Sequence, residues 1–415
     1  MKNILLLLSL LLLNACSTIS EYKTTNSDSN KKDAPYILLI SIDGYRWDYT
    51  DLHKPPFLKD FQKKGASVER LIPSFPTKTF PNHLSLITGR YPMNHGIVGN
   101  RFYAPDLEKS YSLRDASAVT NSEFYNAKPF WTLAEEQGLK SATYFWPGSE
   151  ATYNGIHPSY YLKYNHGASH EERINTVVQW LKKPEQQRPH FVTLYFHDVD
   201  SAGHKYGPNS SQTHAAIQKV DKSISTLMKD LKKLDLPINV IIVSDHGMAQ
   251  LDRSKKEMIG KSKRSKNYLK NFKAIGRGPL VHFYKTNKNF NELTKTISLI
   301  NTESKHYNCY KKDKTPRELN FRKNSRIGDF VCLADRGWSI STKDSSVPKG
   351  NHGWSQLDGT DMHSILYAKG PNFKENFKMT NFRNIDLYPL MAKVLNLEIS
   401  HKIDGSIKKS KLLLK

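Results

Sequence analysis

The sequence lacks an apolar run long enough to cross a membrane near its start. The run from Ile4 to Leu13, in "MKNILLLLSLLLLNAC", spans only ten residues, whereas a helix needs about 20 to cross the core of a bilayer. Lys2 places a positive charge just before this run. A short apolar run behind a basic residue is typical of an export signal, so we expect a signal sequence here rather than a membrane span.

The residues after the apolar run indicate a lipid anchor. The tripeptide "LNA" directly before Cys16 resembles the processing site of bacterial lipoproteins. This resemblance predicts a signal peptide at residues 1–15, a lipid on Cys16 and a polar tether at residues 16–34. The protein would be exported and lipid-anchored to the bacterial envelope, and Ser17 favours the outer membrane and periplasm. An ordinary secretory signal with an incidental cysteine is the alternative.

Cysteine is otherwise scarce, since Cys309 and Cys332 are the only two besides Cys16. Two thiols in an exported protein can pair, and a disulfide between them is expected. Neither cysteine lies among the motifs described below, so we assign them no chemistry.

Patterns that would indicate a dedicated nucleic-acid partner are also missing. No stretch interleaves aromatic residues with arginine, and no helix-turn-helix or zinc-finger pattern occurs. The formal net charge is nevertheless +23, and much of it lies at 253–273, at 311–314 and in the terminal "KKSKLLLK". We expect most of these lysines on the solvated surface, where their field would favour phosphate-bearing substrates and anionic lipid surfaces.

Internal repeats are absent, and the chain instead carries three long apolar runs that reach an aspartate. "APYILLISIDG" contains Asp43, "PHFVTLYFHDVD" ends at Asp200, and "LPINVIIVSDHG" contains Asp245. These runs are rich in β-branched and aromatic residues and do not alternate cleanly, so they predict strands buried on both faces. A fourth run, "SILYAKG", follows at 364–370.

Amphipathic helical segments separate the apolar runs, at 128–138, 171–183 and 213–234. Strands that alternate with helices predict an α/β fold with a mainly parallel central sheet and helices on both faces. The lysine-rich region from about 250 to 345 has few apolar runs, so we expect a smaller inserted subregion without a core of its own. It would belong to one catalytic domain at 35–400, followed by a basic C-terminal tail at 401–415.

Candidate metal ligands lie at the ends of the predicted strands. In such sheets ligands bind outside the carboxyl ends of the strands, so the three aspartates are expected to converge. His204 follows Asp200 by four residues, His246 follows Asp245 directly, and His352 lies in "KGNHGWS". Aspartate and histidine together suit Zn²⁺ or another first-row divalent ion better than Ca²⁺ or Mg²⁺. Three of each exceed what one tetrahedral ion can use, so two ions are expected.

The stretch "PTKTFPNH" at 76–83 holds two threonines between two prolines, ahead of a helical run. A free alcohol is a poor nucleophile at neutral pH, but a divalent cation lowers its pKa, as it lowers that of bound water to about 7. At a helix N-terminus, Thr79 would also meet donors that favour a phosphate oxygen. Two ions about 4 Å apart would stabilise the attacking and leaving oxygens of an in-line displacement.

Five segments in succession resemble a known family: "SIDGYRWDY", "PSFPTKTFPNHLSLITGRYPMNHGIVGN", "DSAGHKYGP", "VSDHGM" and "GNHGW". They look like the signature segments of the nucleotide pyrophosphatase/phosphodiesterase family, in the alkaline phosphatase superfamily, from about Pro35 to residue 373. This resemblance implies an alkaline phosphatase-like fold and a phosphodiesterase activity. It also implies one zinc ion held by Asp43, Thr79, Asp245 and His246, and a second held by Asp200, His204 and His352.

The same resemblance implies roles around the phosphate. Thr79 matches the nucleophile, and Asn100 matches the side chain that helps to hold a phosphoryl oxygen. Phe80 and Tyr164 fall where the family sandwiches a nucleobase, and Leu113 falls where it lines the same pocket.

Two alternatives remain within the site. The chain reads His197-Asp198-Val199-Asp200, where the family commonly has Glu-Pro or a similar pair before the metal-binding aspartate. Asp198 is therefore a competing ligand, although the spacing to His204 favours Asp200. Thr77 is a competing nucleophile, and the motif alignment favours Thr79.

The predicted activity is hydrolysis of phosphodiester or pyrophosphate bonds in nucleotides, through a phosphothreonine and with release of nucleoside monophosphates. The alternative is a phosphodiesterase acting on lipid headgroup esters such as phosphocholine compounds. A sulfatase is disfavoured because no Cys/Ser-x-Pro-x-Arg motif occurs, and a phosphomonoesterase because no arginine is close in sequence to Thr79. A non-catalytic lipoprotein that binds anionic polymers is the least favoured, since no expected ligand is lost.

Overall fold

The computed structural model of the chain describes residues 20–21 and 34–415. The predicted signal peptide, Cys16 and almost all of the predicted tether lie outside the described residues. In the part of the chain that is described, no helix combines the length and the apolar character needed to cross a membrane.

A nine-stranded sheet forms the centre of the molecule, in the order β1-β7-β6-β8-β2-β9-β18-β3-β19. The three apolar runs are neighbours in it, because β2 (Tyr36–Ile42) lies between β8 (Phe191–Phe196) and β9 (Ile238–Val243) and is parallel to both. All of β2 and β8 is buried, as a sheet covered on both faces requires. The predicted α/β fold with a mainly parallel sheet is confirmed.

The fourth apolar run forms β18 (Leu366–Lys369), which is antiparallel to both of its neighbours. The sequence predicted this strand but not its direction. The other strands of the sheet are β1 (Ser20–Glu21), β3 (Ala66–Ile72), β6 (Ser141–Tyr144), β7 (Tyr160–Tyr161) and β19 (Phe377–Arg383). The short strand β1 falls within the segment expected to be a tether and pairs with β7.

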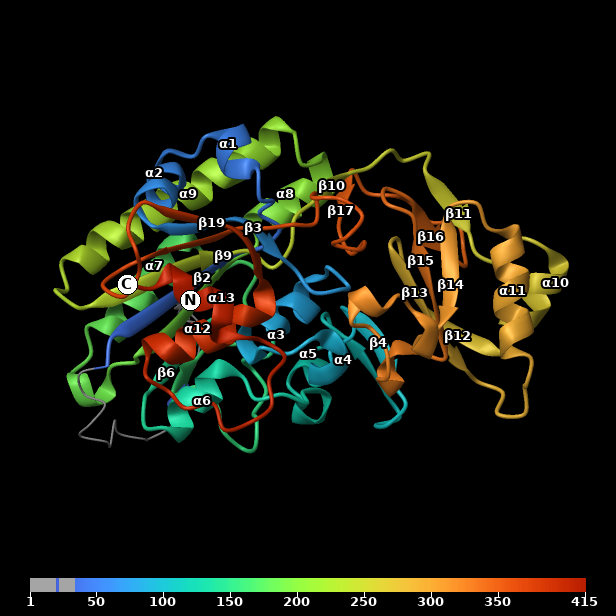
Figure 1. The fold of residues 1–415 in the computed structure, drawn as a ribbon, viewed down its shortest axis with the longest axis horizontal. Coiled ribbons are helices and arrows are strands. Elements are labelled where there is room, and N and C mark those ends of the chain that lie inside the picture. The colour runs from blue at the N-terminus through green and yellow to red at the C-terminus, as the bar shows by residue number, and fades with distance from the viewer. Residues whose placement is uncertain (1–19, 22–33) are drawn as a thin grey trace, which may run out of the picture.

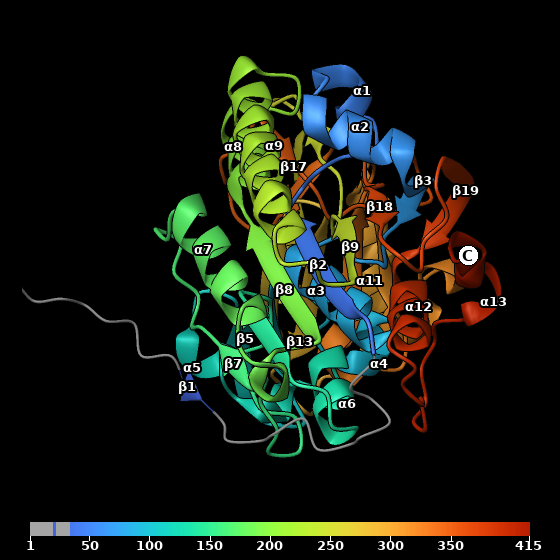
Figure 2. The same ribbon diagram turned by 90° about the vertical axis from the view of Figure 1, so that its left-hand side faces the viewer.

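Helices cover both faces of the sheet (Figure 2). Alternate residues of β2 face opposite sides, so Ile37 packs in one hydrophobic cluster and Leu38 in another. The first cluster includes α3 (Thr79–Thr88), α6 (Phe130–Glu136) and α12 (Leu387–Val394), and the second includes α2 (Pro56–Lys64), α7 (His170–Leu181) and α9 (Ser211–Lys232). The three predicted helices are confirmed as α6, α7 and α9.

The lysine-rich region forms a lobe at one end of the molecule (Figure 1, orange). Its sheet has the order β12-β13-β15-β14, with a buried cluster that includes Val281, Phe283, Ile300 and Phe330. The sequence predicted no separate core here, and the structure corrects this. Short strands with one exposed face, such as β14, dilute the apolar signal. The elements are β11 (Lys256–Met258), α10 (Lys263–Leu269), β12 (Phe272–Arg277), β13 (Leu280–Lys285), α11 (Leu293–Glu303), β14 (Tyr307–Lys311), β15 (Phe330–Ala334) and β16 (Ser339–Ser341).

The expected disulfide is present in this lobe. Cys309 and Cys332 lie opposite each other on the antiparallel strands β14 and β15, and their sulfur atoms are bonded. Both residues belong to the buried cluster of the lobe. The disulfide therefore joins the two strands within the core of the lobe and lies outside the candidate site.

The predicted basic C-terminal tail, residues 401–415, packs on the domain. Asp404 accepts hydrogen bonds from Arg90 and from the backbone of Tyr91, and Leu413 is fully buried beyond α13 (Ile407–Ser410). The lysines of the segment and Leu412 are exposed. The remaining short elements are α1 (Tyr49–His53), α4 (Pro92–His95), β4 (Arg101–Ala104), β5 (Lys109–Ser112), α5 (Ala116–Val119), α8 (Asp198–Tyr206), β10 (Ala249–Gln250) and β17 (Gly350–Asn351).

Candidate active site and metal centre

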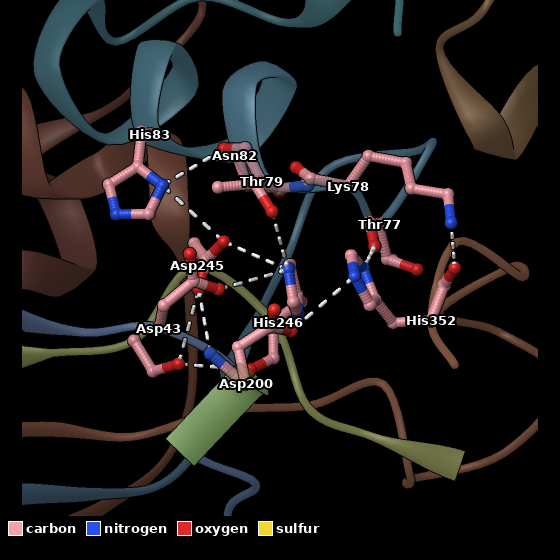
Figure 3. Close-up of polar contacts among 12 residues, drawn as sticks. Asp43, Thr77, Lys78, Thr79, Asn82, His83, Asp200, Asp245, His246 and His352 are labelled. Carbon is pink, nitrogen blue, oxygen red and sulfur yellow. Dashed lines mark hydrogen bonds and ion pairs between the residues drawn. The ribbon is translucent and has the colours of Figure 1, made fainter. Parts of the chain in front are cut away.

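The structure brings the three strand-end aspartates together at the carboxyl edge of the sheet (Figure 3). Asp43 follows β2 directly, Asp245 comes just after β9, and Asp200 lies in the first turn of α8, which follows β8. Since β2, β8 and β9 are parallel neighbours, their ends meet at one edge. The convergence expected from the sequence is thus a consequence of strand order.

The three histidines bring their Nε2 atoms to these carboxylates. His246 Nε2 lies 2.9 Å from Asp245 Oδ2 and 3.4 Å from Asp43 Oδ1. The Nε2 atoms of His204 and His352 lie 3.5 and 3.6 Å from Asp200 Oδ1, and 3.2 Å from each other. The three aspartates and three histidines therefore form one continuous cluster.

Two overlapping groups within the cluster are compact enough to hold a metal ion. One consists of Asp43, Asp245 and His246, and the other of Asp200, His246 and His352. His246 is common to both groups, so it lies between them. Thr79 borders the first group, because its Oγ1 is 3.3 Å from His246 Nε2.

Backbone carbonyl groups orient all three imidazoles. His204 Nδ1 is 2.8 Å from the Gly350 carbonyl oxygen, His246 Nδ1 is 2.9 Å from that of Gly247, and His352 Nδ1 is 2.7 Å from that of Thr77. A carbonyl oxygen can only accept, so the proton of each ring belongs on Nδ1. The lone pair on Nε2 is then available to a cation, which is the usual arrangement of a metal-ligating histidine.

The carboxylates lack the partners that burial would otherwise require. In residues 20–21 and 34–415, no donor reaches the buried Oδ1 atoms of Asp43 and Asp200. Burial, and then repulsion by Asp245 and Asp200, raises the pKa of Asp43 well above its usual value. Buried oxygen atoms of this kind are costly unless a donor or a cation satisfies them. These oxygen and nitrogen donors therefore fit divalent cations of the zinc type.

Electrostatics within the cluster favour the ligand states of Asp245 and His352. Burial opposes ionisation of Asp245, but His246 and His83 outweigh it and hold the pKa of this carboxyl below its usual value. Burial, and then repulsion by a protonated His246, lowers the pKa of His352 well below its usual value. Asp245 is thus a carboxylate and His352 a neutral imidazole at pH 7, as metal ligands must be.

The part of the site that is expected to hold phosphate lies at the start of α3. Thr79 is the first residue of this helix, and the backbone N–H of Phe80 donates to Asn100 Oδ1 at 3.0 Å. Lys78 reaches the His352 carbonyl oxygen, and its Nζ lies 3.3 Å from Asn351 Oδ1. Burial lowers the pKa of Lys78 to about 8. Lys78 was not among the residues expected at the site, although it directly precedes Thr79 in the sequence.

The two competing residues are both occupied elsewhere. Thr77 is fully buried, and its Oγ1 donates to the Trp354 carbonyl and accepts from Gly353 N, both at 2.9 Å. Asp198 pairs with His170 at 2.8 Å and with Lys219 at 2.7 Å. Asp198 belongs to neither candidate metal-binding group, which favours Asp200. The Thr77 hydroxyl is taken up by the Trp354 and Gly353 backbone, whereas that of Thr79 lies beside His246, which favours Thr79.

Two residues outside the expected ligand set, Tyr195 and His83, hold the cluster in place. The hydroxyl of Tyr195 donates to Asp43 Oδ2 at 2.6 Å. His83 Nδ1 lies 2.9 Å from the Thr79 carbonyl oxygen and 3.4 Å from Asp245 Oδ2. Tyr195 lies in a strand of mainly apolar residues, so the sequence pattern predicts a core residue at this position. No signal in the sequence distinguished it from its neighbours.

The three residues expected to contact an organic group lie around this edge. Phe80 follows Thr79 directly, and the backbone N–H of Leu113 donates to the Asn100 carbonyl oxygen at 3.0 Å. Tyr164 is 45% exposed, and its ring centroid is 6.1 Å from that of Tyr195. The structure therefore places an accessible aromatic ring near the cluster.

Residues 37–355 match the family model described as type I phosphodiesterase / nucleotide pyrophosphatase. The chain belongs to this family. It is 38% identical over 383 residues to the human ectonucleotide pyrophosphatase/phosphodiesterase family member 1, which covers 88% of this chain and 40% of that protein. It is 33% identical over 406 residues to a bis(5'-adenosyl)-triphosphatase of Xenopus laevis, which covers 96% of this chain and 85% of that one.

The fold agrees with the same family. A structure of murine ectonucleotide pyrophosphatase/phosphodiesterase 5, an inactive variant in complex with AMP, superimposes with a TM-score of 0.85 and 30% identity. The match covers 92% of this chain and all of that one. The resemblance read from the sequence, and with it the alkaline phosphatase-like fold, is confirmed. The chain spans only two fifths of the length of the human relative.

The two carboxylates of α8 allow a matched test of the metal centre. Asp200→Asn should lower the divalent metal content of the purified protein, because Asp200 Oδ1 is the carboxylate oxygen next to Nε2 of His204 and of His352. Asp198→Asn removes a carboxylate two residues away that is paired elsewhere, and should leave the metal content unchanged. Metal analysis by mass spectrometry measures both. Equal loss in the two variants would contradict the assignment of Asp200.

Proposed function

We propose that the protein hydrolyses phosphodiester and pyrophosphate bonds of nucleotides and related phosphodiesters, with two zinc ions and Thr79 as the nucleophile, releasing nucleoside monophosphates. The observation that carries the proposal is the position of Thr79. Its hydroxyl lies 3.3 Å from His246 Nε2 at the border of the ligand cluster, on the first residue of a ten-residue helix. Family membership supports the same reaction class.

In this proposal one zinc ion is held by Asp43, Thr79, Asp245 and His246, and the other by Asp200, His204 and His352. When bound, the ions lower the pKa of the attacking oxygens and neutralise charge on the phosphoryl group. The carbonyl groups of Gly247, Gly350 and Thr77 keep the three imidazoles turned toward the ions.

The residues of the chain then perform a two-step transfer. Thr79 Oγ1 gives up its proton to solvent and attacks the phosphorus atom, the bond to the leaving oxygen breaks, and a phosphothreonine forms. In the second step water attacks this phosphorus, the bond between phosphorus and Thr79 Oγ1 breaks, and Oγ1 takes up a proton to restore the threonine. Asn100 is fixed through the Phe80 N–H and helps to hold a phosphoryl oxygen, while the α3 N-terminus favours its negative charge.

A nucleotide is the preferred substrate class in this proposal. Phe80, Leu113 and Tyr164 offer apolar and aromatic surface beside the cluster, which suits stacking on a nucleobase. AMP is bound in the murine relative of similar fold, which supports a nucleotide here. An ester of a lipid headgroup, such as a phosphocholine compound, is the second candidate because the sequence suggests a lipid anchor. We propose no dedicated nucleic-acid partner.

Replacement of the nucleophile tests the reaction. Thr79→Ala should lower kcat by at least about a thousandfold, since the loss of a covalent nucleophile removes several kcal/mol of transition-state stabilisation. Thr79→Ser, which keeps a hydroxyl, should retain part of the activity. Zinc content measured in parallel shows whether the cluster survives. Full turnover by Thr79→Ala with bound zinc would refute the role of Thr79.

Two chromogenic esters that share one leaving group distinguish a nucleotide substrate from a lipid headgroup substrate. The protein should hydrolyse the p-nitrophenyl ester of thymidine 5'-monophosphate with a higher kcat/KM than p-nitrophenyl phosphocholine, because only the first carries a nucleobase. The reverse preference would establish the lipid headgroup candidate in its place.

Export and lipid anchoring at Cys16 are part of the proposal and rest on the sequence alone. In cells labelled with radioactive palmitate, the full-length protein should carry label and should sediment with the envelope. Cys16→Ser should carry none and should be recovered in soluble fractions. Label that persists in Cys16→Ser would exclude this residue as the lipid site.

A further inference from the structure

Arg173 is a fully buried cation that forms no ion pair with any described residue. It lies in α7 with no exposed surface, and in the described part of the chain no carboxylate pairs with it. Its donors go to two backbone carbonyl groups instead. Nη1 donates to Tyr195 O at 2.6 Å, and both Nε and Nη2 donate to Ala168 O at 3.2 Å. Burial of a guanidinium is costly, so these two segments are tied together at an energetic cost.

The first segment belongs to the metal side of the site. Tyr195 lies in β8, and its hydroxyl donates to Asp43 Oδ2 at 2.6 Å. Arg173 therefore holds the backbone of the residue whose side chain supports a candidate metal ligand. The guanidinium also lies 6.0 Å from the ring of Phe196, the next residue of the strand.

The second segment is the turn that carries Tyr164. Ala168 N donates to Asn165 O at 3.3 Å, and Gly167 N donates to Asn165 Oδ1 at 2.9 Å. Residues 162–169 contain no helix or strand, so the turn depends on such contacts for its position. Arg173 anchors its end at Ala168.

Tyr164 itself lies between the two segments. Its ring centroid is 5.1 Å from that of Phe145 and 6.1 Å from that of Tyr195. The Arg173 guanidinium lies 5.4 Å from the same Phe145 ring. Tyr164 also has direct partners, since its backbone N–H donates to Glu150 Oε1 at 3.0 Å and its hydroxyl lies 2.9 Å from His166 Nδ1. Arg173 adds the contact that joins the end of the same turn to the strand of Tyr195.

We propose that Arg173 is a positioning residue that fixes the turn of Tyr164 to the strand end of Tyr195, and so sets the affinity of the site for a substrate with an aromatic organic group. The inference rests on the proposed function, because it needs a phosphoester substrate. Without Arg173, binding must also order the turn, which weakens binding of the aromatic group. The chemical step at Thr79 does not use this contact, so loss of Arg173 should change KM more than kcat.

Two esters with the same leaving group test this proposal. One is the p-nitrophenyl ester of thymidine 5'-monophosphate, and the other is methyl p-nitrophenyl phosphate, which carries no base. In the zinc-loaded protein, Arg173→Met should raise KM for the thymidine ester about tenfold. Its preference for the thymidine ester over the methyl ester, expressed as a ratio of kcat/KM values, should fall by a similar factor.

Three further variants sharpen the test. Lys182→Met removes an exposed cation just after the same helix and should leave the preference unchanged. Arg173→Lys keeps the charge but loses the forked contact, and should give an intermediate value. Arg173→Met combined with Tyr164→Ala should lower the preference no further than the larger single effect, because both changes remove one shared interaction.

The outcomes separate the two proposals. If the wild-type protein hydrolyses neither ester, the proposed function fails. If it hydrolyses both and Arg173→Met leaves the preference unchanged, or lowers kcat equally for both esters, the positioning role is refuted. Additive effects of Arg173→Met and Tyr164→Ala would also refute it. If thermal melting shows that Arg173→Met is not folded, the test uses Arg173→Lys in its place. A preference equal to that of the wild-type protein in Arg173→Lys would then count against the proposal.

Discussion

The structure depends on three carboxylates that are buried together at one edge of a sheet. Asp43, Asp200 and Asp245 meet because three parallel strands end side by side, and like charges at this distance destabilise one another unless cations separate them. Burial, and then this repulsion, raises the pKa of Asp43 well above its usual value. Much of the surrounding structure orients further ligands around these carboxylates.

That surrounding structure acts mainly through backbone carbonyl groups. Gly247, Gly350 and Thr77 each take one imidazole Nδ1, so the ligand atoms are fixed by the course of the main chain. Tyr195 and Arg173 continue the same arrangement outward, from Asp43 to the turn of Tyr164. The metal side and the organic side of the site are therefore mechanically connected.

The lysine-rich lobe supports the opposite side of the site. Arg326 is buried and donates to the carbonyl oxygens of Gly96 and Phe124 at 3.2 and 2.5 Å. Gly96 begins the loop that leads to Asn100. Lys273 of β12 lies over the ring of Tyr103 in the hairpin that follows. The lobe thus contacts the segment that carries Asn100, the side chain proposed to hold a phosphoryl oxygen.

The layers of the fold and the candidate ligands follow from the pattern of the sequence. Apolar runs that reach Asp43 and Asp245 mark buried strands and the residues at which they end, because a long apolar run and the point where it stops are local features of the sequence. The tertiary structure decided which residues act through others. Tyr195 and Arg173 look like ordinary members of a strand and a helix, and only the packing of β8 against α7 shows what they hold. It also gave the lysine-rich lobe its core, because half-exposed strands bury apolar surface only after they pair.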